Sequence, residues 1–171
     1  MSPLHAKRRT MMQVTELARE IGERLFAMQW QLAVAESCTG GGIAHAITEI
    51  AGSSQWFDCG LVAYSNESKI RLLQVHEHLI QQHGAVSKEV AEAMAAGILQ
   101  ISRAQISISV TGIAGPGGAT ETKPVGTVYF GFATAHRVHS EHKLFSGDRQ
   151  AIRTQSIIHA LHRLLEILTE E

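Results

Sequence analysis

Ala-Glu-Ser-Cys-Thr-Gly-Gly-Gly, at residues 35–42, is the stretch of sequence on which the predicted fold depends. It follows the apolar run at residues 32–34, which is typical of a short buried strand. It precedes residues 43–50, whose apolar positions fall on one face of a helix. The stretch is therefore predicted to connect the end of a strand to the start of a helix.

A strand-to-helix junction has chemical value because the first turn of a helix leaves backbone N–H groups without partners. Those groups can stabilise a developing oxyanion or bind a phosphate, and glycines such as Gly40 and Gly41 let a ligand approach the backbone closely. Ser37, Cys38 and Thr39 all remain candidates for a nucleophile. The alternative is that Ser37 or Thr39 is only a helix N-cap, a common role for these residues.

The order of the predicted elements indicates an α/β fold. Strands alternate with helices, and two adjacent strands then precede a final helix, which predicts a three-layer α/β/α sandwich. Its sheet should be mixed and mostly parallel, with an antiparallel hairpin late in the chain. Helices are predicted at about 13–29, 40–50, 66–73, 76–83, 87–103 and 148–169, with Asn66, Ser87 and Asp148 as N-caps, and strands at 31–35, 56–64, 106–110, 125–133 and 138–145.

Ligands of such sheets bind beyond the carboxyl ends of the strands. Ser37, Tyr64 and Thr111 each close a predicted strand, so we expect them to lie at one edge of the sheet. The glycine-rich and proline-containing loop at 111–118, with Gly112 and Gly115, offers further backbone N–H groups there.

A serine hydroxyl needs a base to remove its proton, and no histidine falls at a predicted strand end near this cluster. Lys69 is the candidate, because a desolvated lysine can act as a base. Tyr64 could orient the lysine, relay a proton or donate one to a leaving group. The alternatives are a solvated helix lysine and a half-buried tyrosine ring at a strand end.

Three cations could bind a phosphate. Lys123 follows the loop at 111–118, and Arg149 and Arg153 share a face of the last predicted helix because they are four positions apart. The alternative is a solvated arginine pair. No Walker A pattern and no dinucleotide-binding glycine motif opens a helix.

Composition narrows the class of protein. The 171 residues fit one domain at 13–171, with residues 1–12 expected to be a flexible extension. A net charge of −1 does not favour binding to nucleic acid or to a membrane. Two cysteines and no apolar leader favour the cytoplasm. The spacing of the ten histidines fits no metal motif, so we expect no metal and no other cofactor.

Six ordered blocks carry a resemblance to the CinA carboxy-terminal domain family, which covers residues 13–168. The chain resembles the stand-alone form, because longer members carry an additional amino-terminal domain. The blocks are Ala-Glu-Ser-Cys-Thr-Gly-Gly at 35–41, Tyr-Ser-Asn-Glu at 64–67, Gly-Ala-Val-Ser at 84–87, Thr-Gly-Ile-Ala-Gly-Pro at 111–116, Lys-Pro-Val-Gly-Thr at 123–127 and Phe-Ser-Gly-Asp-Arg at 145–149.

The resemblance implies deamidation of nicotinamide mononucleotide to nicotinic acid mononucleotide and ammonia, in recycling of pyridine nucleotides (NAD). It implies Ser37 as the nucleophile, Lys69 as its base and Tyr64 as an assistant in proton transfer. It also implies a homodimer. The matching blocks assign substrate binding to Thr39, Gly40, Gly41, Thr111, Gly112, Gly115, Lys123 and either Arg149 or Arg153.

Two other functions stay open. The same loops could hold a phosphorylated ligand or a partner in a module without catalysis, in which Ser37 only caps a helix. The chain could also be an amidase for a different small amide. Release of ammonia from nicotinamide mononucleotide separates the first of these from the deamidase, and a panel of amides separates the second.

Overall fold

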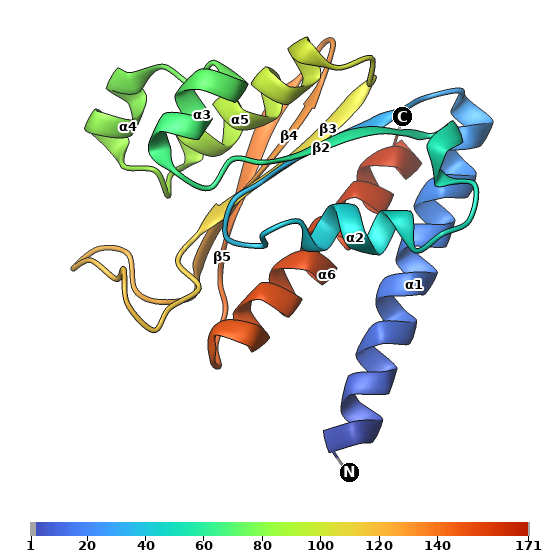
Figure 1. Cartoon of the computed structure of the whole chain (residues 1–171), viewed down its shortest axis with the longest axis horizontal. Coiled ribbons are helices and arrows are strands. Elements are labelled where there is room, and N and C mark those ends of the chain that lie inside the picture. The colour runs from blue at the N-terminus through green and yellow to red at the C-terminus, as the bar shows by residue number, and fades with distance from the viewer. Residues whose placement is uncertain (1–2, 171) are drawn as a thin grey trace.

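A computed structural model describes residues 3–170, which form a five-stranded sheet with helices on both faces (Figure 1). The elements follow each other as α1 (Pro3–Met28), β1 (Leu32–Glu36), α2 (Gly42–Thr48), a 3₁₀ turn (Ser53–Gln55), β2 (Phe57–Val62), α3 (Asn66–Leu73), α4 (Glu77–His83), α5 (Lys88–Ile101), β3 (Ile106–Gly112), β4 (Thr127–Thr134), β5 (Val138–Leu144) and α6 (Arg149–Glu170).

The strand order is β2-β1-β3-β4-β5. Strand β1 pairs in parallel with β2 and β3, whereas β4 is antiparallel to both β3 and β5. Four strands therefore share one direction and β4 alone opposes them. This confirms the predicted α/β sandwich with a mixed sheet and a late antiparallel hairpin.

Helices α1, α2 and α6 cover one face of the sheet, and α3, α4 and α5 cover the other (Figure 1). Strand β1 is buried on both faces, which fits its uniformly apolar start. Leu32 and Val34 pack into the core beneath α1 and α6, and Ala33 and Ala35 pack into the core beneath α5. Ser37, the residue that follows this strand, consequently extends from a strand that is packed on both faces of the sheet.

Most predicted bounds shift by one or two residues, and two predictions about helix starts need correction. Helix α1 begins at Pro3 instead of residue 13, so residues 3–12 belong to a helix. Residues 1 and 2 lie outside the described residues, and the flexibility of residues 1–12 stays a prediction. The N-cap of α3 is Ser65, and the prediction of Asn66 was wrong. Ser65 keeps an extended backbone, and its Oγ accepts the N–H of Ser68 at 3.0 Å.

The other two predicted caps are confirmed. Ser87 Oγ accepts the N–H of Val90 at the start of α5, and Asp148 Oδ1 accepts the N–H of Ala151 at the start of α6. These caps fix where α5 and α6 begin, and both helices start next to the edge of the sheet that carries Ser37. Within residues 3–170, no helix has both the length and the apolar character that a membrane crossing requires.

Candidate active site

Ser37 directly follows β1, which lies between β2 and β3 in the sheet. Its backbone N–H donates a hydrogen bond of 2.9 Å to the carbonyl of Val110 on β3. The side chain is nearly covered, with 8% of the residue exposed. The sheet therefore holds this hydroxyl in a fixed place at the carboxyl end of the parallel strands.

Lys69 reaches the same place from the first turns of α3. Its Nζ donates hydrogen bonds to Ser37 Oγ and to the carbonyl of Tyr64, both at 3.1 Å. Only 2% of the residue is exposed, so Lys69 is not the solvated helix lysine of the alternative reading. Burial lowers the pKa of this amine from its ordinary value of 10.5, because desolvation disfavours the charged form.

Glu36 supports the loop next to the site, and the sequence analysis missed it. It is 1% exposed, and its two carboxylate oxygens accept the backbone N–H groups of Ile43 at 3.0 Å and Ala44 at 2.8 Å. The carboxylate thus satisfies the first turn of α2, whose N-cap Gly41 has no side-chain cap bond. Ser37 and Thr39 do not cap α2, so that alternative reading was wrong.

The loop between β1 and α2 turns sharply. Gly40 and Gly41 have φ values of 59° and 91°, in the region that favours glycine, and Gly40 N–H bonds back to the Ser37 carbonyl at 3.0 Å. Thr39 is fully buried, and its hydroxyl has no partner within residues 3–170. Gly40 and Gly41 thus allow the sharp turn of the loop that carries Ser37.

Cys38 is the rival nucleophile. It is 6% exposed, and burial raises the pKa of its thiol to about 12. A thiol with this pKa is almost entirely protonated near neutral pH, and the thiolate is the reactive form. The geometry therefore favours the hydroxyl of Ser37, which has an amine beside it, over the thiol.

The two arginines of α6 differ in what they contact. Arg149 donates to the carbonyl of Gly115 at 2.7 Å and to the hydroxyl of Tyr64 at 3.0 Å. Arg153 donates from Nε to the carbonyl of Cys38 at 3.1 Å and from its terminal nitrogen to the carbonyl of Thr39 at 3.0 Å. The spacing of four puts both arginines on one face of α6. They lie one turn of helix apart, and each has different partners.

Tyr64 has two separate contacts. Its carbonyl accepts from Lys69, and its hydroxyl accepts from Arg149, while 58% of the residue stays exposed. The backbone of Tyr64 therefore orients the lysine, and its ring stands at the rim of the site.

Lys123 bonds to the last residue of α4, and Thr111 bonds to the turn between α4 and α5. Thr111 Oγ1 donates to the carbonyl of Ala85 at 2.8 Å, and Lys123 Nζ donates to the carbonyl of His83 at 2.7 Å. Gly112 lies close to Cys38, because a Cβ on it would come within 3.1 Å of the sulfur. Thr111 and Lys123 thus hold the turn that forms one wall of the site.

A pocket of about 210 Å³ joins these groups. Six of the predicted site residues line it: Ser37 after β1, Tyr64 between β2 and α3, Lys69 on α3, Thr111 and Gly112 on β3, and Arg149 on α6. The other predicted residues do not line it, namely Thr39, Gly40, Gly41, Gly115, Lys123 and Arg153. The remaining lining residues are Cys38, Asn66, Ala85, Val86 and Ala114.

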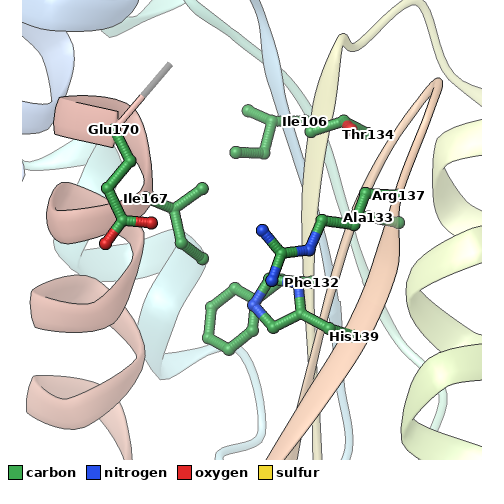
Figure 2. A pocket seen from close by; sticks show the side chains of 8 residues that line it. All are labelled: Ile106, Phe132, Ala133, Thr134, Arg137, His139, Ile167 and Glu170. Carbon is green, nitrogen blue, oxygen red and sulfur yellow. The ribbon is translucent and has the colours of Figure 1, made fainter.

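A second pocket, of about 150 Å³, lies between α6 and the strands β3 to β5 (Figure 2). Arg137 and Glu170 stand on opposite sides of it, and the Phe132 and His139 rings stack at 5.3 Å (Figure 2). Ile106, the first residue of β3, also lines it, which puts this pocket at the opposite end of that strand from Thr111. It contains none of the predicted site residues, so the Ser37 pocket is the candidate active site.

Comparison with known proteins identifies the family. Residues 14–168 match the model of the CinA C-terminal domain. "Nicotinamide-nucleotide amidohydrolase PncC" of Pseudomonas putida is 50% identical over 157 residues, which are 92% of this chain and 98% of that protein. The protein of the same name from Escherichia coli (strain K12) is 48% identical over 89% of this chain and 93% of the relative.

Solved structures give the same result. The competence/damage inducible protein CihA from Agrobacterium tumefaciens has a TM-score of 0.88 at 40% identity, covering 91% of this chain and 95% of that one. A CinA superfamily protein from Klebsiella pneumoniae has a TM-score of 0.89 at 35% identity, covering 92% and 99%. The chain belongs to the CinA C-terminal domain family.

Proposed function

We propose that this protein is a nicotinamide-nucleotide amidohydrolase, which converts nicotinamide mononucleotide to nicotinic acid mononucleotide and ammonia with Ser37 as nucleophile. The observation that carries the proposal is the 3.1 Å contact between Ser37 Oγ and the buried amine of Lys69. The names of relatives about 50% identical over most of their length support the substrate.

Lys69 acts first, as the base. Burial favours its neutral amine, whose lone pair can accept the hydroxyl proton of Ser37. As the proton leaves, Ser37 Oγ attacks the carboxamide carbon, a C–O bond forms, and the carbonyl oxygen becomes an oxyanion. The backbone N–H of Cys38, a residue that lines the pocket, has no acceptor in another described residue and can donate to that oxygen.

Collapse of this intermediate breaks the C–N bond. The leaving nitrogen takes a proton and departs as ammonia, with the Lys69 ammonium and the Tyr64 hydroxyl as donors in the same pocket. Water then attacks the ester on Ser37, and Lys69 takes a proton from that water. Cleavage of the ester gives the carboxylic acid and restores the serine hydroxyl.

Arg149 binds the phosphate of the substrate in this proposal. It lines the pocket with Ser37 and Lys69, whereas Arg153 does not, and its partners there are uncharged. A guanidinium binds phosphate oxygens in a two-pronged fashion, so the substrate phosphate can replace the Gly115 carbonyl or the Tyr64 hydroxyl as its partner. The loop at 111–118 would enclose the ligand from the other side.

Ammonia release from nicotinamide mononucleotide tests the proposal. The purified protein should release one ammonia per nicotinic acid mononucleotide formed, and Ser37→Ala should lose about three orders of magnitude or more in turnover while melting like the wild type. A protein that binds the nucleotide but releases no ammonia would be the non-catalytic module. Activity only on other small amides would mean that nicotinamide mononucleotide is not the substrate.

The family resemblance also supports a homodimer that works in the cytoplasm in recycling of pyridine nucleotides. Light scattering of the purified protein measures whether it is a homodimer. A mass of one chain at working concentrations would reject the dimer without affecting the proposed reaction.

A further inference from the structure

We infer that Arg153 is a positioning residue, which fixes the loop that presents Ser37 by holding the carbonyls of Cys38 and Thr39. The inference rests on the proposed function and deepens it. It also gives Arg153 a role other than phosphate binding.

Two of the three guanidinium nitrogens of Arg153 bond to the loop that carries Ser37. Nε bonds to the Cys38 carbonyl at 3.1 Å, and the terminal nitrogen bonds to the Thr39 carbonyl at 3.0 Å. The guanidinium also packs over Gly40, where a Cβ would come within 3.2 Å of it. This arginine comes from α6, 115 positions along the chain from Cys38, so the loop depends on a distant element for its shape.

The planarity of the peptide bond converts these contacts into an orientation. In a trans peptide, the C=O of one residue and the N–H of the next point in opposite directions. Because the Cys38 carbonyl points to Arg153, the N–H of Thr39 points away from it. This peptide plane, one residue beyond Ser37, is therefore fixed by a side chain of α6.

The neighbouring peptide plane is held by a backbone bond instead. The Ser37 carbonyl accepts the N–H of Gly40 at 3.0 Å, so the N–H of Cys38 points away from Gly40. Two successive N–H groups are thus set by contacts on their carbonyl side. Arg153 is the side chain that sets the second, and Glu36 holds the helix start that follows.

The chemistry of arginine fits this task. Its planar group donates from two nitrogens at fixed spacing, which matches two successive carbonyls. A lysine ammonium also has several N–H donors, but its flexible stem does not hold them at a fixed spacing. We therefore expect Arg153→Lys to retain part of the function and Arg153→Met, which has no donor, to lose it.

The test uses two substrates for Ser37. Nicotinamide mononucleotide reports the proposed reaction, and p-nitrophenyl acetate reports acylation of the serine through an oxyanion without any phosphate. Arg153→Met should lower kcat and the acylation rate by about 100-fold, because a small displacement of the loop misplaces Ser37, with KM little changed. Guanidinium ion added to Arg153→Ala should restore part of the rate.

Arg163→Met is the matched control. Arg163 also lies on α6 and bonds to acidic side chains, Glu141 and Glu166, but it does not line the pocket. Its replacement should leave both rates unchanged. If Arg153→Met does not fold, kcat and KM of Arg153→Lys are measured instead. A positioning role then requires kcat to fall by a larger factor than KM changes.

The outcomes separate this inference from the proposed function. Acylation of Arg153→Met at the wild-type rate overturns the inference, as does a loss that follows the melting temperature and is not rescued by guanidinium. If p-nitrophenyl acetate acylates the wild type and Arg153→Met lowers that rate, but nicotinamide mononucleotide stays intact, only the proposed substrate is overturned. If neither compound reacts with the wild type, both fall.

Discussion

The amine of Lys69 and the hydroxyl of Ser37 lie 3.1 Å apart, although the two residues are 32 positions apart and belong to different elements. The lysine is almost fully buried, and its second partner is the neutral carbonyl of Tyr64. No carboxylate within residues 3–170 forms an ion pair with it. An amine in this setting favours its neutral form, which is the form that a base needs.

Replacement of Lys69 tests its role as the base. The Lys69→Arg variant would keep a positive charge at this position, but a guanidinium does not lose its proton in proteins. We expect Lys69→Arg and Lys69→Met each to lower kcat for ammonia release by about 10³-fold, within the range that a general base contributes. Melting curves control for folding. Activity of Lys69→Arg near the wild-type value would reject the lysine as base.

The pH dependence of kcat/KM tests the protonation state. The neutral amine is the active form, so kcat/KM should rise about tenfold per pH unit while Lys69 is protonated and level off above its pKa. Burial lowers this pKa, so the plateau should begin below pH 10.5. A rate that falls with rising pH over this range would contradict a lysine base.

Cys38 should be dispensable for the chemistry. Burial raises the pKa of its thiol to about 12, so little thiolate exists at neutral pH. Cys38→Ala should keep turnover within about tenfold of the wild type, with some loss of stability from the cavity. Turnover and reaction with iodoacetamide are the measurements. A loss of about 100-fold in turnover at unchanged stability would indicate thiol chemistry.

The sequence predicted the elements well because their signals are local. The apolar run at residues 32–34, the alternation in β3 and the capping residues Ser87 and Asp148 each report on a few neighbouring positions. The strand order, in contrast, depends on which strands pair across long distances. Local pattern also misplaced the cap of α3, because Ser65 and Asn66 are both good caps and only the backbone decides between them.

The site shows the same division. Residues at strand ends were predicted to meet, and Ser37, Tyr64 and Thr111 do line one pocket. Glu36 was missed because an acidic residue at the end of a buried strand gives no signal until the start of α2 is placed above it. The choice between Arg149 and Arg153 also required coordinates, since their spacing indicates only a shared helix face.

Packing of α5 against α3 should control the position of Lys69. A Cβ on Gly97 would lie 1.9 Å from the carbonyl oxygen of Leu73, at the end of the helix that carries Lys69. Gly97→Ala should therefore lower the free energy of unfolding by roughly 1–3 kcal/mol and reduce turnover as α3 shifts. Denaturant unfolding and ammonia release measure the two effects.

Gly117→Ala is the matched control for that substitution. A Cβ at Gly117 has no heavy atom within 4 Å, so stability and turnover should stay near wild type. Equal stability of the two variants would show that α3 and α5 are not packed as closely as described.

The ester on Ser37 is the direct test of the central claim. Protein quenched during turnover with nicotinamide mononucleotide should carry the nicotinic acid mononucleotide acyl group, mapped by peptide mass spectrometry to Ser37, and hydroxylamine should divert part of the product to the hydroxamate. An adduct on Cys38, or turnover with neither adduct nor hydroxamate, would contradict the account.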